Sequence, residues 1–148
     1  MSAEAIIRQT IESHLADWDH AYAEKDAYGY LGHCTPDVTG ELEQALLFYR
    51  QLMPFCEVLE SHSTVRKFTV EDKQAVVTIQ VDQKLVIKEP VATLPLFNKF
   101  VIGCLARLVF VSREVRHLIW VDTPVGWLCK SDNRVSNRLR VRRKPAPI

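Results

Sequence analysis

The stretch WDHAYAEKDAYGYLGHCTPD, residues 18–37, joins the end of one long helix to a short second helix. Apolar side chains upstream of it recur at steps of three and four, which is the period of one helical face. This spacing predicts a helix over residues 3–24, and Ser2 is suited to cap its start. The predicted buried face comprises Ile7, Ile11, Leu15, Trp18 and Tyr22.

Two further helices are expected in the first half of the chain. Asp26 can cap a short helix that runs through Gly32, and the Pro36–Asp37 pair ends it because proline restricts the residue before it and donates no backbone hydrogen bond. A third helix is expected from Glu41 to Leu59, with a kink or interruption at Pro54.

The apolar period then changes to two, which is typical of strands. It is clearest where Val77, Ile79 and Val81 alternate with polar residues. Residues 91–104 fit either a helical insertion or a loop followed by a strand. The first expected strand approaches a turn at 71–73, and the second ends at Pro90. The third covers residues 107–123. After a turn at 123–126, the fourth covers residues 127–142, with a break near Asp132–Asn133.

Helices followed by long strands predict the α+β class. Strands of this length must curl, by twist and by bulges, to cover the helices. We expect N-terminal helices packed in a strongly curved, mostly antiparallel sheet that forms a cone-shaped half-barrel. A chain of 148 residues suits a single domain, residues 1–148, with a basic tail from about residue 140.

Two segments resemble the nuclear transport factor 2-like superfamily, especially its SnoaL-like branches. One is HLIWVDTPVGWLCKS, residues 117–131, which is similar to a closing hairpin in which a Trp-containing strand turns through Gly-Trp and returns. The other is residues 18–37, where the matching residues are Trp18, Ala21-Tyr22, Lys25-Asp26, Tyr30-Leu31 and Pro36-Asp37.

The resemblance implies a conical apolar pocket enclosed by a curved sheet and helices. Enzymes of this superfamily, such as ketosteroid isomerases, scytalone dehydratase and polyketide cyclases, transfer protons inside such a cone. Many members carry an Asp two residues before the hairpin Trp, facing the pocket, where this chain has Leu118. That departure weakens the case for any mechanism that relies on this carboxylate.

Titratable side chains on apolar faces are the catalytic candidates, because desolvation moves their pKa toward neutrality. His14 lies on the apolar side of the first helix, and His117 has the strand parity of Ile119 and Val121. We predict His117 or His14 as the base and Tyr22 as the hydrogen-bond donor to an enolate oxygen. A lone histidine on an apolar face is more often a core residue bonded to a backbone carbonyl, and this interpretation stays open.

Four more residues are predicted to contact the ligand: Trp18, Tyr30, His62 and Trp120. Aromatic side chains at helical spacing often serve packing alone, although the two roles overlap in a hollow cone. His62 is expected at the start of the first strand, near the mouth of the pocket. Asp82 and Asp122 have the opposite parity to their apolar neighbours and are expected to face water.

No metal or cofactor site is expected. Cys34, Cys56, Cys104 and Cys129 are far apart, with no CxxC pair and no histidine at metal spacing. We expect them to be small buried hydrophobic residues rather than zinc ligands or disulfides. The sequence also lacks a Gly-rich phosphate loop and the GxSxG and HExxH motifs.

Charge is distributed unevenly along the chain. Residues 1–60 hold three basic and eleven acidic residues, whereas the remainder holds sixteen basic and seven acidic ones. Six of the basic residues lie between Arg134 and Lys144, without interleaved aromatic residues that could stack on bases. We therefore expect no nucleic-acid partner, and charge that faces water or meets the acidic helices of the same or a second subunit.

The sequence predicts neither a membrane span nor a signal peptide. Its longest apolar region, residues 91–111, is interrupted by Pro95, Lys99 and Arg107, and its first ten residues lack a basic start. We expect a cytoplasmic protein.

Two hypotheses for the function remain: a cofactor-independent isomerase, dehydratase or cyclase acting on a small apolar molecule, or a non-catalytic module that binds a ligand or a partner. In the second, a homodimer would form through the open face of the sheet, using Leu108, Phe110 and Trp120.

Overall fold

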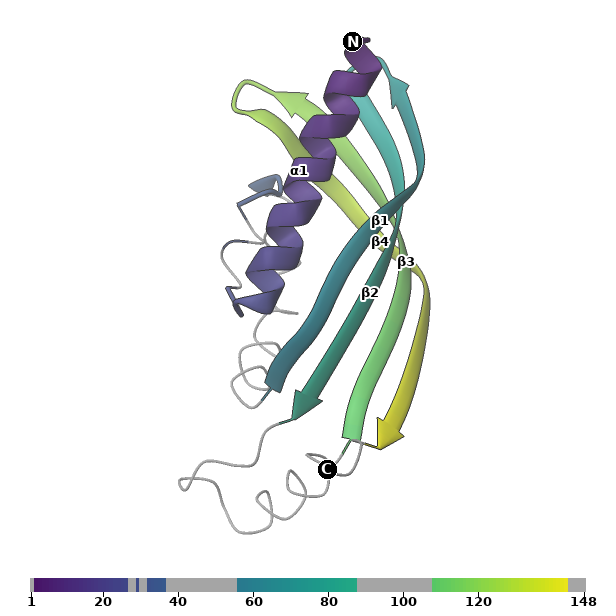
Figure 1. Cartoon of the computed structure of the whole chain (residues 1–148). Coiled ribbons are helices and arrows are strands. Elements are labelled where there is room, and N and C mark those ends of the chain that lie inside the picture. Colours follow the sequence, from purple (N-terminus) through teal and green to yellow (C-terminus); the bar gives the residue numbers. More distant parts are fainter. Residues whose placement is uncertain (1, 27–28, 30–31, 37–55, 88–107, 144–148) are drawn as a thin grey trace.

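The computed structural model describes residues 2–26, 29, 32–36, 56–87 and 108–143. Within these residues, one helix precedes a four-stranded antiparallel sheet, so the predicted α+β class is confirmed (Figure 1). The elements are α1 (Ala3–Ala23), β1 (Cys56–Glu71), β2 (Gln74–Ile87), β3 (Leu108–Thr123) and β4 (Gly126–Arg143).

Helix α1 begins and ends where its local sequence predicts. The Ser2 hydroxyl accepts a hydrogen bond of 3.1 Å from the amide of Ala5, which is the bond of an N-cap. After the helix, Lys25 has a φ of 60° and turns the chain away. The amide of Gly29 then donates to the Asp26 carboxylate at 3.0 Å, as expected for a cap at Asp26. Tyr30 lies outside the described residues.

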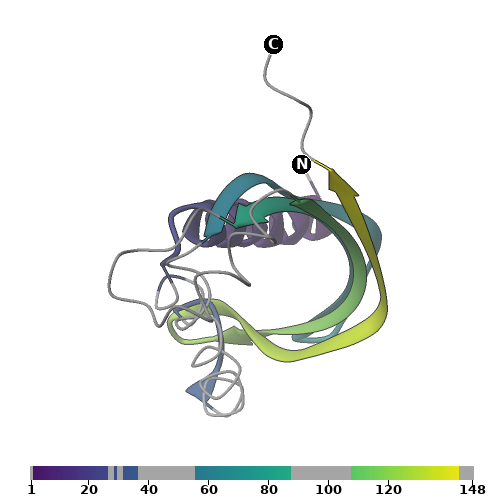
Figure 2. The same cartoon turned by 90° about the horizontal axis from the view of Figure 1, so that it is seen from below.

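The four strands pair in chain order, joined by hairpins at both expected turns. Asp72, with a φ of 53°, and Lys73 connect β1 to β2. Gly126, with a φ of 112°, starts β4, and this left-handed backbone favours glycine. Figure 2 shows that the long strands curve around α1 without closing, which is the half-barrel expected from the sequence.

The core lies between α1 and the concave face of the sheet. Ile11, Leu15 and Trp18 are at most 4% exposed and pack against strand residues that are equally buried. Burying one such large apolar side chain contributes about 1.5–3 kcal/mol. The strand residues of this cluster are Ala75, Val77, Ile79, Val81, Leu118, Trp120 and Cys129.

A carboxylate attaches one flank of α1 to β1. Asp19 accepts hydrogen bonds from the Ser61 hydroxyl at 2.9 Å, the Ser63 amide at 2.8 Å and the Ser63 hydroxyl at 3.1 Å. These bonds fix the rotation of the helix, because they act on the flank next to its apolar face.

Two sequence-based expectations are wrong. Residues 56–59, predicted to end the third helix, belong to β1, where Cys56 pairs with Ile87 and Val58 with Leu85; strand pairing overrides the helical pattern there. Residues 37–55, including Pro54, lie outside the described residues, as do residues 88–107. The expected break near Asp132 is also absent, since β4 continues to Arg143. Register shifts instead leave Lys130 and Val135 without a partner on β3.

Candidate functional site

Strand register decides which side chains face α1. Val77 pairs with Leu118 and Ala75 with Trp120, and all four side chains are fully buried. Because side chains alternate along a strand, the residues between them point to the opposite, convex face. The concave face of β3 is therefore the face of Leu118 and Trp120.

His117 lies on the convex face. Its side chain is exposed, and its Nδ1 is 2.8 Å from the hydroxyl of Thr78, its register partner. The predicted parity with Ile119 and Val121 is correct, but the expectation that this face lines the pocket is wrong. The face against α1 is taken by the fully buried pair Leu118 and Trp120.

His14 contacts a histidine that the sequence pattern did not single out. Its Nδ1 lies 2.6 Å from the Nδ1 of His33, and the two rings meet edge to face with centroids 4.8 Å apart. The His14 ring also lies 5.2 Å from that of Trp120, which in turn lies 5.4 Å from Trp18. Two imidazoles and two indoles thus form one contiguous cluster between α1 and the sheet.

Backbone pairing positions His33. The amide of Cys129 donates to the His33 carbonyl at 2.8 Å, and the amide of Thr35 donates to the Cys129 carbonyl at 2.9 Å. This isolated parallel bridge between Cys34 and Cys129 holds the segment against β4. His33 belongs to neither a helical nor a strand pattern, so its place beside His14 had no signal in the sequence.

Burial disfavours the protonated form of both imidazoles. Desolvation lowers the pKa of His14 below 6.5, and the neighbouring His33 lowers it further, whereas Asp17 partly opposes the shift. The pKa of His33 is lowered by burial, again against Asp17. In the neutral pair one Nδ1 donates its proton to the other, so the Nε2 of the donating ring is left as an acceptor. The pair can therefore accept a proton from outside.

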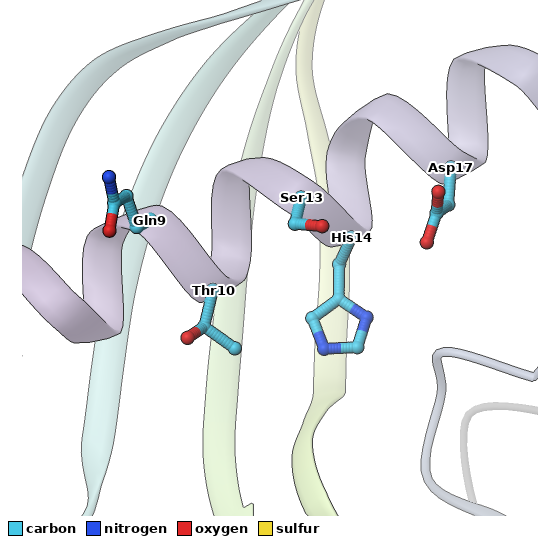
Figure 3. A pocket seen from close by; sticks show the side chains of 5 residues that line it. All are labelled: Gln9, Thr10, Ser13, His14 and Asp17. Atoms are coloured by element: carbon cyan, nitrogen blue, oxygen red, sulfur yellow. The ribbon is translucent and has the colours of Figure 1, made fainter.

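An open depression lies beside the pair. It has a volume of about 410 Å³ and is lined by Gln9, Thr10, Ser13, His14 and Asp17. Figure 3 shows Thr10, His14 and Asp17 extending from the same side of α1. The histidine cluster is thus reached from a polar surface on the flank of the helix.

The concave face also carries buried charges. The Asp132 carboxylate, with its side chain 4% exposed, accepts hydrogen bonds from Arg116 Nε at 2.9 Å and from Arg116 Nη2. Asp132 is the register partner of Leu118, so β4 supplies an inward carboxylate opposite Leu118 of β3. The unpaired residues of β4 interrupt the alternation of inward and outward side chains, so the sequence pattern did not predict that this carboxylate faces inward.

Tyr22 lies near the second ion pair of this face. Arg134 and Glu114 are 2.8 Å apart, and the Glu114 side chain is largely buried. Burial, with smaller contributions from Cys56 and Glu114, raises the pKa of Tyr22 to about 12. The hydroxyl therefore stays protonated at neutral pH and can act as a donor.

Three predicted ligand contacts have different surroundings. Trp18 and Trp120 are 4% and 0% exposed, so they act chiefly as packing. His62 is exposed on β1 and lines a second depression, of about 380 Å³, between β1 and α1. Leu108 and Phe110 share the face of Trp120, so the face proposed for dimerisation is the concave one. The homodimer stays a prediction.

Within the described ranges, no three His, Cys, Asp or Glu side chains are arranged to hold a metal ion. Cys34, Cys56 and Cys129 are buried, as expected, and a hydrogen bond from Cys129 lowers the pKa of Cys34. None of the helical segments described here is both long enough and apolar enough to cross a membrane.

Comparison with known proteins shows the fold. No protein-family description matches the chain, and no curated protein matches it significantly. Among solved structures, it is similar to a candidate aromatic ring hydroxylase from Novosphingobium aromaticivorans, with a TM-score of 0.63 and 12% identity over 95% of this chain and 96% of that one. The two proteins share an architecture over nearly their whole length.

Proposed function

We propose that the chain binds a small, largely apolar molecule beside α1 and moves a proton on it without a cofactor, with the His14–His33 pair as the proton acceptor. The observation that carries this proposal is the 2.6 Å contact between the two Nδ1 atoms. The Nε2 of the ring that donates in this hydrogen bond can take up one proton, and the neutral partner ring then accepts a hydrogen bond from the resulting imidazolium.

The surroundings of the pair support an apolar and aromatic substrate. Trp120 and Trp18 present indole rings to His14 and to each other. The buried Trp120 Nε1 has no acceptor among the described residues, so it could donate to a polar group of a ligand. The name of the structural neighbour, which refers to aromatic rings, makes aromatic ketones a sensible first set of probes.

Tyr22 acts at a different point from the histidines in this proposal. It lies eight residues after His14 on α1, which corresponds to about 12 Å along a helix. One substrate atom cannot touch both side chains. Tyr22 would therefore donate to the far end of an elongated molecule, and His117 has no part in the reaction because it faces the convex side.

The alternative is a non-catalytic ligand-binding module. It is favoured by the fact that His14 and His33 hydrogen-bond to each other, as two histidines with a purely structural role would also do. The two functions differ in whether a bound molecule exchanges a carbon-bound proton.

Proton exchange tests the proposal directly. The protein is incubated in D2O with a panel of aromatic and alicyclic ketones, and loss of the α-C–H signal is followed by NMR. We expect catalysed exchange, slowed about 100-fold or more by either His14→Gln or His33→Gln. The double variant should be no slower than either single one, because the pair acts as a unit.

His62→Gln is the matched control, because it removes an exposed histidine from β1. Full exchange activity in His14→Gln would overturn the assignment of the base. Binding that changes tryptophan fluorescence without any exchange would establish the non-catalytic alternative.

A further inference from the structure

The second half of β4 is exposed along its whole length. Residues 133–143 are all exposed, and β4 is the last strand in the sheet order, bonded on one side to β3. Beyond the isolated bridge at Cys129, no described residue pairs with the other edge of β4. Such an edge offers a row of backbone donors and acceptors to another extended segment.

The two faces of this edge differ in chemistry. Arg138, Arg140 and Arg142 share the convex face, because their register partners on β3 are Arg113, Val111 and Val109. The residues between them face the concave side, where Leu139 is 60% and Val141 48% exposed. Arginine and large apolar residues therefore alternate along the free edge.

The arginines of this edge differ from Arg113 in their ion pairing within the described part of the chain. Arg113 is paired with Asp82 at 2.7 Å, but Arg138, Arg140 and Arg142 form no ion pair with the described residues. Arg138 lies directly across from Arg113, and like charges at opposite positions are unfavourable. An acidic partner would relieve this repulsion, whereas a second copy of β4 would set arginine against arginine.

We propose that this edge of β4 binds an extended acidic segment of a partner protein by strand addition. The partner segment alternates acidic and apolar residues, so that carboxylates meet Arg138, Arg140 and Arg142 on the convex face and apolar side chains meet Leu139 and Val141 on the other. Backbone hydrogen bonds supply affinity and the alternation supplies specificity. Nucleic acid fits less well, because the convex face of this edge offers arginine without aromatic rings.

A labelled ten-residue peptide of alternating Glu and Val, titrated with the full chain by fluorescence anisotropy, tests the proposal. We expect it to bind at least tenfold tighter than an alternating Lys–Val peptide and than a block peptide of five Glu followed by five Val. Replacing both Arg140→Glu and Arg142→Glu should weaken binding at least tenfold. Lys130→Glu, which changes an exposed charge near the hairpin of the same strand, should leave it unchanged.

Peptide N-methylation separates strand addition from simple charge attraction. Methyl groups on all Val amides or on all Glu amides block opposite edges of the peptide. One of the two methylated peptides should bind and the other should not. Equal binding of both, absence of peptide binding, or tighter binding of a single-stranded oligonucleotide would overturn the proposal.

Discussion

At the His14–His33 contact, burial and the neighbouring imidazole both oppose protonation. The pKa of each ring is lowered below the 6.5 of an unfolded chain. As pH falls below about 6.5, the unfolded chain therefore takes up protons before the folded protein does. The pair's contribution to the free energy of unfolding is fully present above that pH and is lost as pH falls through the lowered values.

Urea unfolding between pH 7.5 and 5 measures this loss. We expect the free energy of unfolding to fall with pH in the native protein and to fall less steeply in a His14→Gln/His33→Gln double variant. His62→Gln, which removes an exposed imidazole of β1, is measured beside it as a control variant. Equal slopes in the native protein and the double variant would show that the contact does not oppose protonation.

At the scale of elements, Asp19 is the polar link between α1 and β1. Asp19→Ala leaves two hydroxyls and one amide of β1 without their acceptor. We expect a loss of about 2 kcal/mol in the free energy of unfolding, the range for hydrogen bonds to a charged group. Glu12→Ala breaks only the exposed ion pair with Arg8 and should cost at most about 0.5 kcal/mol. If both variants lowered the free energy of unfolding by a similarly small amount, the Asp19 hydrogen bonds would not stabilise the packing of α1 on β1.

Some of these elements could be predicted from the sequence and others could not. Helix α1 and the two hairpins were predictable because their signals are local: a capping serine, a stripe of one period, and turns at Asp72 and Gly126. The first residues of β1, 56–59, were assigned to a helix because the strand end they pair with, near Ile87, lies far along the chain. For His33 the limit was the same, since the Cys34–Cys129 bridge that positions it is non-local.

Strand parity shows a second limit. Alternation put His117 on the right side of β3 relative to its neighbours, but it could not say which side faces α1. On β4, the unpaired residue Lys130 shifts the alternation and turns Asp132 toward the interior, and Val135 shifts it again for the residues that follow. A two-residue period therefore predicts which residues share a face, and only packing decides which face becomes the site.

At the scale of the whole molecule, the Arg116–Asp132 pair places opposite charges on the concave face of the half-barrel, beside an apolar core. The Asp132 side chain is 4% exposed and that of Arg116 is 20% exposed, so breaking the pair leaves a charge that water reaches poorly. We expect Arg116→Met alone to lower the free energy of unfolding by about 3–5 kcal/mol. The double variant Arg116→Met/Asp132→Leu should recover most of that loss, because two apolar side chains then fill the same space.

Urea unfolding of the three proteins measures the effect, with Arg134→Met as a comparison in which the ion pair is more exposed. If the double variant is as unstable as the single one, the pair contributes through specific hydrogen bonds rather than by neutralising a buried charge.

The same double variant also separates the effect of the ion pair on stability from any effect on the proposed reaction. The proposed reaction uses the histidine pair and not these two charges, so proton exchange should survive in the double variant.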